Sequence, residues 1–456
     1  MRHTRLAGLF FGLAACSFDP HGMPSTGEDA GGDAATIDGA VGVDASAIDA
    51  PINAVDASAI DAAAIDARPA DARPIDARPP DASPPDAMCP GGPLGFTPAN
   101  FDPCAIPPSG GNLQMAAGTW TLDTGGAQIT LTDNNGAAVS ISASTIAQTS
   151  GGQMIAVVTA SSITIGAGAT LRVTGSKPLV LVGLSSVTIA GNLDASAEGH
   201  VSGPGAGTDG DCSATTPGDG FGAAGGTYTD DNNHKGGGGG GGGAFGLDGG
   251  DGGLIEKAQN NPNNPAGGVA DGNTTITPLR GGCHGGAGGN GGGGSGGGGG
   301  AIQISTPMLT VSGAIAVAGG GGAGSPNNAN SSGGGGGGAG GAILLDATSI
   351  TLGPTVKLTA NGGGGGEGRR AGPENSGGGQ NGHKTDAVQA NGGTGSTGGD
   401  GGKGGAQSGA AANGVLGNES TLNAGGGGGG GGAVGRIHGR VALISAGTAV
   451  ISPAAQ

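Results

Sequence analysis

Two stretches of the chain decide the fold, because they repeat the same pattern of apolar residues. Residues 301–318 read AIQISTPMLTVSGAIAVA, and residues 342–360 read AILLDATSITLGPTVKLTA. In the first, alternating apolar runs begin at Ile302, Leu309 and Ile315, which are 7 and then 6 residues apart, and the second keeps these intervals. Alternation sends every second side chain to one face of a β-strand. Each stretch therefore predicts three short strands with a common aliphatic face.

Related patterns occur further out in both directions. Including the two above, they lie near residues 129–146, 155–174, 179–196, 301–318, 342–360 and 433–451. Three strands in about 24 residues correspond to one coil of a parallel β-helix, which buries its apolar face only by stacking on other coils. We therefore expect an all-β fold, a parallel β-helix-like solenoid of about six coils. The last coil departs from the pattern, because Arg436 stands where an inward apolar residue is expected. A β-sandwich is the alternative.

Glycine accounts for 114 of the 456 residues, and it is concentrated between the predicted coils. Three Gly-rich insertions, residues 197–299, 319–340 and 361–431, each follow a coil and return to the next through Gly-Gly-Ala and an apolar residue. They would leave one face of the solenoid, where insertions often form a binding surface. Residues 392–406 read GGTGSTGGDGGKGGA, with a period of three. A bundle of polyglycine II strands, with three residues per turn, fits this period; disordered linkers fit the composition equally.

The first 88 residues differ from the rest in composition. Arg2 and Arg5 precede a ten-residue apolar stretch, which has the length of a signal-peptide core and is too short to span a membrane. The following residues repeat an Asp-Ala pair and contain too few large apolar side chains to form a core. We expect a signal peptide at residues 1–15 and a disordered tether, rich in Asp, Ala and Pro, at residues 16–88.

The remaining chain is predicted to divide near the first coil. Residues 89–118 are Pro-rich and are expected to cap the solenoid, which would occupy residues 119–456. This part contains an even number of cysteines, which in an exported chain suggests disulfides. The four candidates, which allow three connectivities, are Cys89, Cys104, Cys212 and Cys283.

Three features of the chain together resemble the glycine-rich surface lipoproteins of myxobacteria and related bacteria. They are the sequence Leu-Ala-Ala-Cys ending at Cys16, the Asp-Ala/Pro tether, and a Gly-rich repeat region that ends in GGGGGAVGRI. The resemblance implies cleavage before Cys16 and attachment of lipid to that cysteine, and Ser17 after it implies sorting to the outer membrane. That group has no activity to transfer. An ordinary secretory signal followed by a chance cysteine is the alternative.

Charge and composition narrow the choice of function. The net charge is −17, and no basic patch is interleaved with aromatic residues, so nucleic acid is a poor candidate partner. Scattered histidines and the absence of a CxxC motif assign no metal site. GxGxxG matches many times in the poly-Gly runs and therefore assigns no cofactor, and no GxxxxGK motif followed by Ser or Thr occurs. Asp194 and Asp346 are the only acids within the predicted strands, so no catalytic residues are assigned.

We therefore expect a non-enzymatic, lipid-anchored protein of the outer membrane or cell surface, with a structural or adhesive role. Its partners would be the membrane, through the lipid on Cys16, and surface polysaccharide or other envelope components. The alternative is a carbohydrate-active β-helix protein, a polysaccharide lyase or hydrolase, with Asp194 as the residue to test.

Overall fold

The computed structural model describes most of the chain after residue 90. The described residues are 91–207, 212, 220–229, 233–256, 264–327, 331–372, 376–395, 398–407, 409–418, 424–445 and 447–456. The predicted signal peptide and tether, together with Cys16 and Cys89, lie outside them. In the described part, helical structure is limited to a 3-10 turn, η1 (Gly92–Leu94), and the single residue Cys212, and no helix there is long and apolar enough to cross a bilayer.

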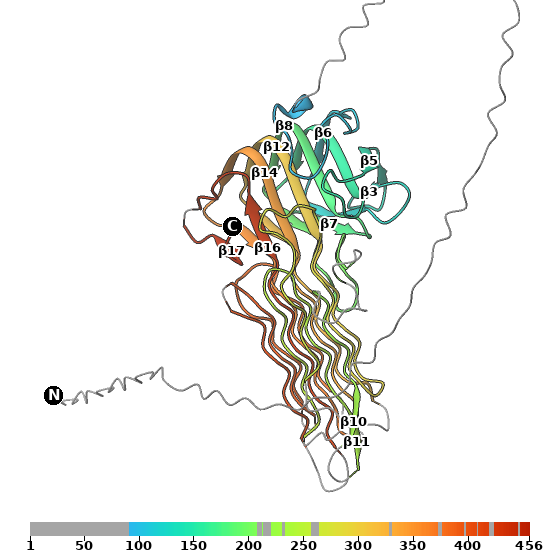
Figure 1. Ribbon diagram of the computed structural model, residues 1–456. Helices are drawn as coiled ribbons and strands as arrows, with labels where there is room; N and C mark the ends of the chain where they lie inside the picture. Colours follow the sequence, from blue (N-terminus) through green and yellow to red (C-terminus); the bar gives the residue numbers. More distant parts are fainter. Residues whose placement is uncertain are drawn as a thin grey trace, which may run out of the picture. The chain divides into compact units, whose positions relative to one another are not determined.

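Most strands belong to two sheets (Figure 1). Sheet A has seven strands, with β5 paired to β6 beside the main order. Its strands are β1 (Asn112–Met115), β6 (Ile155–Ile165), β8 (Leu179–Ile189), β12 (Ala301–Val311), β14 (Ala342–Leu352), β16 (Arg436–Gly439) and β5 (Ser142–Ile146). Sheet B has eight strands, in the order β17 (Val450–Ser452), β15 (Lys357–Thr359), β13 (Ala314–Ala316), β9 (Asn192–Asp194), β7 (Ala169–Thr174), β2 (Gly118–Asp123), β3 (Thr130–Thr132) and β4 (Ala138–Val139). A separate antiparallel hairpin joins β10 (Thr227–Thr229) and β11 (Lys235–Gly237).

The prediction of a parallel β-helix-like solenoid of about six coils is wrong. The strands form two open sheets that do not close into a solenoid, and each repeat contributes one strand to each sheet rather than three strands. Residues 129–146, expected to form a coil, instead contain β3, β4 and β5, whose pairings are all antiparallel. Large parallel sheets are usually covered by helices. Here the inner faces of the two sheets cover each other, and part of the outer face of sheet A is covered by residues of the N-terminal segment and of the first Gly-rich insertion.

One unbroken strand, rather than two strands and a turn, spans the odd interval of the repeat. An odd interval of 7 moves an apolar residue to the other face unless the strand is interrupted, so the spacing from Ile302 to Leu309 suggested a turn. Instead, β12 runs without a break through Pro307, and its register against β8 shifts between Ser305 and Met308. Two residues of β12 oppose three of β8 at this point, so the extra residue of the bulge lies on β8. β12 and β14 pair without a shift, so both strands change their inward face together, on β12 between Ile304 and Leu309.

The two sheets share one aliphatic core. Buried residues of sheet A, such as Val187 and Leu309, belong to the same cluster as Leu171, Leu193 and Ile315 of sheet B. All five are at most 1% exposed. Burial of aliphatic side chains is worth roughly 1.5–3 kcal/mol each, so this core can hold the sheets together although aromatic residues are scarce.

The N-terminal segment packs on the outer face of sheet A. Phe96 and Phe101 belong to a second apolar cluster with Val157, Val180 and Val182 on the first halves of β6 and β8. Residues 112–115 of the predicted cap form β1, which pairs in parallel with β6. The segment therefore covers part of a sheet face and extends that sheet.

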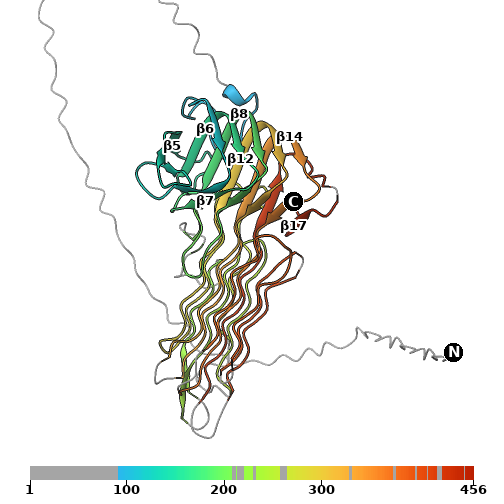
Figure 2. The same cartoon turned by 180° about the vertical axis from the view of Figure 1, so that it is seen from behind.

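The Gly-rich segments lie side by side as extended strands that leave the sheets at one end (Figures 1 and 2). We call the described parts of residues 197–299, 319–340 and 361–431 the glycine bundle. The segments run from the ends of β9, β13 and β15 in sheet B to the starts of β12, β14 and β16 in sheet A.

Hydrogen bonds show how the glycine bundle is built around residues 237–244. Their N–H groups donate in turn to three neighbouring segments, so that Gly237, Gly240 and Gly243 bond to residues 331, 334 and 337. Their carbonyl groups accept from three further segments in the same way, for example Gly240 from Gly430. A change of partner at each residue, with a return at every third, is expected of a strand with three residues per turn. This strand therefore has six neighbours.

Close approach of backbones explains the glycine content. A Cβ atom on Gly239 would lie 1.9 Å from the carbonyl oxygen of Gly428, and one on Gly242 would lie 1.8 Å from that of Gly431. Both contacts are with backbone atoms, which cannot rotate away as a side chain can. Alanine is therefore excluded at Gly239 and Gly242, where a neighbouring backbone carbonyl occupies the place of a Cβ atom.

Candidate functional site

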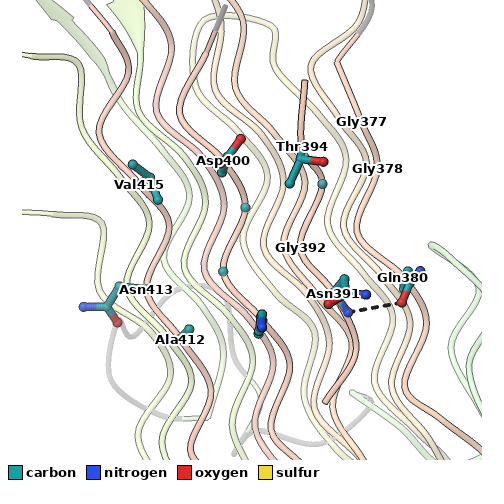
Figure 3. Close-up of a pocket in the computed structure, with 14 residues that line it drawn as sticks. Gly377, Gly378, Gln380, Asn391, Gly392, Thr394, Asp400, Ala412, Asn413 and Val415 are labelled. Carbon is teal, nitrogen blue, oxygen red and sulfur yellow. Dashed lines mark hydrogen bonds between the residues drawn. The ribbon is translucent and has the colours of Figure 1, made fainter. Parts of the chain in front are cut away.

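A groove of about 630 Å³ lies on the surface of the glycine bundle (Figure 3). It is lined by parts of four segments, residues 377–380, 391–394, 400–403 and 412–415. We call it the bundle groove. Its exposed side chains are Gln380, Asn391, Thr394, Asp400, Lys403, Asn413 and Val415.

Backbone bonds hold the four segments in register. The N–H of Gly401 donates to the carbonyl of Gly393 at 2.8 Å, and the N–H of Val415 donates to the carbonyl of Asp400 at 2.8 Å. The side chain of Gln380 accepts from the N–H of Asn391 at 3.2 Å, as the dashed line in Figure 3 marks. The side chains of the bundle groove therefore stand on a backbone framework.

The period of three determines which side chains reach the groove. Between residues 399 and 405 the interior positions are glycines, and Asp400 and Lys403, three residues apart, are exposed. Three residues of a polyproline II strand span about 9 Å, so one side chain appears at that interval along each segment. The sequence showed this period, but it did not show which segments would lie side by side.

The bundle groove can form hydrogen bonds with a ligand rich in hydroxyl groups. The amides of Gln380, Asn391 and Asn413 both donate and accept, the hydroxyl of Thr394 does the same, and Lys403 donates. Asp400 is the one carboxylate of the lining. Most glycosidases use a pair of carboxylates, so the lining fits binding better than glycoside cleavage.

Asp194, the residue singled out for the enzymatic alternative, lies in an ion-pair cluster on sheet B. Its carboxylate contacts Arg172 at 3.0 Å and Lys384 at 2.8 Å. Glu198 contacts the same two cations at 3.6 and 3.4 Å. Burial raises the pKa of Asp194, but the hydrogen bond from Lys384 and the charges of Arg172 and Lys384 outweigh it, so the pKa is lowered. A carboxylate in this state is a poor general acid.

Asp346, the other acidic candidate, belongs to a buried polar network between sheet A and the N-terminal segment. It is 1% exposed. Its oxygens accept from the backbone N–H of Ala99 at 3.0 Å and from Gln303 at 3.1 Å, and Arg440 pairs with it at 3.0 Å. These partners hold the N-terminal segment on the sheet, which is a structural role.

Three of the five cysteines lie within the described residues, and all three are disulfide-bonded. Cys212 and Cys283 form a disulfide with Cα atoms 5.4 Å apart, across 71 residues of sequence. Cys104 is also disulfide-bonded. Cys89 and the predicted lipid-attachment residue Cys16 lie outside the described residues.

The assignment of Arg436 to the inward face is wrong by one residue. Ile437 is buried in the core opposite Ile343, and Arg436 pairs with Ala342 on the other face of the strand. A shift of one residue exchanges the two faces of a strand. The sequence carried a signal for the correct register, because Ile437, and not the adjacent Arg436, is the apolar residue that a core-facing position requires.

In the described part of the chain, no group of three or more His, Cys, Asp or Glu side chains is placed to hold a metal ion. The candidate features are thus the bundle groove and the two acidic clusters. The Asp194 cluster borders a smaller hollow of about 130 Å³, to which Asn192 and Thr385 contribute exposed polar groups, so the bundle groove is the larger of the two. No protein-family model matches the chain, and no curated protein and no solved structure is significantly similar to it.

Proposed function

We propose that this chain is a lipid-anchored protein of the outer membrane and cell surface, with a structural or adhesive role rather than a catalytic one. The bundle groove carries the proposal, because its polar side chains stand at intervals of three residues on a hydrogen-bonded backbone. A backbone that is already ordered loses little conformational freedom when a ligand binds. Amide and hydroxyl groups in such positions suit contact with hydroxyl-rich envelope material.

The acidic cluster on sheet B supports the choice against a lyase or hydrolase. Arg172 and Lys384 already neutralise Asp194, and the lowered pKa keeps its carboxylate ionised. A general acid needs a proton near the working pH. The cluster therefore suits stabilisation of the fold.

Adhesion can be tested with the full chain and isolated bacterial envelope fragments. The Asn391→Ala, Thr394→Ala variant removes two polar groups of the bundle groove and is expected to lower retention on the fragments at least threefold. Gln407→Ala, an exposed change outside the groove, is the matched control. Equal retention of all three proteins would show that the bundle groove does not bind the fragments. Absence of retention of the wild type would contradict an adhesive role.

The anchor can be tested in cells. The wild type is expected in the outer-membrane fraction and Cys16→Ala in the soluble fraction, because a protein without acyl chains loses its hold on the bilayer. Ser17→Ala keeps the cysteine and serves as the control. Full recovery of Cys16→Ala in the membrane would refute the anchor.

A further inference from the structure

A row of threonines crosses the outer face of sheet A on four adjacent parallel strands. The pairing aligns Thr164 with Thr188, Thr188 with Thr310, and Thr310 with Thr351. Gln114 on β1 pairs with Thr164 and extends the row to a fifth strand. With strands about 4.8 Å apart, the row is about 19 Å long. We call these five residues the hydroxyl ladder.

The ladder faces solvent on the half of the sheet beyond the N-terminal segment. Gln114, Thr310 and Thr351 are exposed, and Thr164 and Thr188 are half-buried. Among the described residues, none of the four threonine hydroxyls has a hydrogen-bond partner. Their hydrogen-bonding capacity is therefore available to a ligand.

A second row runs beside the first, two residues earlier on each strand. It contains Ser162, Ser186 and Ser349, with Met308 between the last two on β12. Met308 is 57% exposed. A flexible thioether among hydroxyls can contact the C–H groups of a ligand while the neighbours bond its oxygens.

The chemistry of this face selects a neutral, hydroxyl-rich partner. Neither row contains a charged side chain, whereas the whole chain carries a net charge of −17. An anionic polymer would be repelled by the chain as a whole and would find no cation in these rows to compensate. A nucleic acid or an anionic lipid surface is therefore disfavoured.

We infer that the hydroxyl ladder binds a neutral linear polysaccharide that lies across the strands of sheet A. One strand spacing is close to the length of one sugar unit in an extended chain, so successive sugars meet successive threonines. The parallel hydrogen-bonded register keeps the hydroxyls evenly spaced without help from the ligand. This inference rests on the proposed adhesive role and names a partner for a face other than the bundle groove.

The experiment measures retention of the full chain on microcrystalline cellulose and on neutral xylan, with anionic alginate as the charge control. The Thr188→Val, Thr310→Val variant removes two central hydroxyls and keeps the β-branched shape that suits strands. We expect retention of the wild type on at least one neutral polymer, and a fall of tenfold or more for this variant. Thr119→Val, Thr130→Val, which changes exposed threonines of sheet B, is the matched control and is expected to bind like the wild type.

Thr188→Lys provides a second probe, because a long cation blocks the ladder without depending on the loss of a single hydroxyl. Unchanged far-ultraviolet circular dichroism and melting temperature identify the variants that fold. Unchanged retention of both folded ladder variants overturns the inference.

The outcomes separate the inference from the proposed function. If the wild type is retained on envelope fragments but on no neutral polymer, the inference about the hydroxyl ladder is overturned and the proposed adhesive role is kept. If it is retained on neither material, the inference and the adhesive role are both overturned. Loss of polymer binding in Asn391→Ala, Thr394→Ala alone assigns the polysaccharide to the bundle groove and overturns the ladder. Inhibition of ice recrystallisation that Thr188→Val, Thr310→Val abolishes, without retention on any polymer, assigns the ladder to ordered water and also overturns it.

Discussion

Arg436 and Phe245 connect the last strand of sheet A to the glycine bundle, with the guanidinium carbon 5.7 Å from the centroid of the ring. The Nη2 atom of Arg436 also donates to the carbonyls of Phe245, Asp271 and Gly272. Arg280 approaches the same ring at 5.1 Å and pairs with Asp271 at 2.6 Å. Burial, followed by the charge of Arg280, lowers the pKa of Arg436 although Asp271 opposes the shift. The cation is held by an aromatic face and by carbonyl oxygens.

Replacement of Arg436 by leucine is expected to lower the free energy of unfolding by about 2 kcal/mol, because the buried carbonyl of Phe245 loses a charged donor. Urea denaturation followed by circular dichroism measures the change. Lys403→Ala, which removes an exposed cation, is the control and is expected to change stability by less than about 0.5 kcal/mol. Equal midpoints for the two variants would contradict the role given to Arg436.

Alanine at an interior position of the glycine bundle is expected to disrupt it. Gly239→Ala brings a methyl group against the carbonyl oxygen of Gly428 and is expected to cost about 3 kcal/mol or more. Gly378→Ala is the matched control, because its Cβ would meet its nearest neighbour at 3.7 Å, an ordinary contact. Thermal unfolding of the two variants measures the difference, and a similar melting temperature for both would argue against the packing described.

The ion-pair cluster on sheet B predicts a dependence of stability on pH. The pKa of Asp194 in the folded protein lies below its ordinary value of 3.8. Its contribution is therefore fully present well above pH 3.8 and is lost as the pH falls through the lower folded-state value. Asp194→Asn is expected to be less stable than the wild type at neutral pH and to differ less from it in acid. A difference that grows in acid would contradict this assignment.

The same variant tests the enzymatic alternative. Because Asp194 is neutralised by Arg172 and Lys384, we expect no release of reducing ends from polysaccharides by the wild type, and none by Asp194→Asn. A reducing-sugar assay over the panel used for binding measures this. Release by the wild type that the variant lacks would establish the enzyme and refute the proposed function.

The disulfide between Cys212 and Cys283 closes a long loop and is expected to contribute about 2–4 kcal/mol. The double variant Cys212→Ala, Cys283→Ala is expected to show a lower denaturation midpoint under non-reducing conditions. It leaves the disulfide of Cys104 in place, so reduction of the whole protein is not needed. An unchanged midpoint would show that the loop is held by its other contacts.

Alternation of apolar residues predicted much of the core and little of the topology. Leu309 and Ile315 are buried as expected, because alternation reports the inward face directly. The odd interval before Leu309 can be accommodated by a turn between two strands or by a change of face within one continuous strand, and local sequence does not choose between them. β12 and β14 each run without a break through this interval, so each replaces two predicted strands.

The candidate sites depend on contacts that local patterns do not report. The period of three in residues 392–406 indicated outward positions such as Asp400, but the segments that complete the bundle groove are matched only by folding. Lys384, which neutralises Asp194, is 190 residues away from it. The hydroxyl ladder likewise depends on the register between strands, which brings Thr188 beside Thr310.

The glycine bundle also has a thermal consequence. Its interior consists of peptide groups that bond to one another and buries few apolar side chains. Exposure of apolar surface raises the heat capacity of unfolding, and exposure of polar surface lowers it. The bundle therefore adds little to the heat-capacity change, and its stability varies less with temperature than that of an aliphatic core. In the cold, where hydrophobic stabilisation weakens, the sheets lose strength before the bundle does.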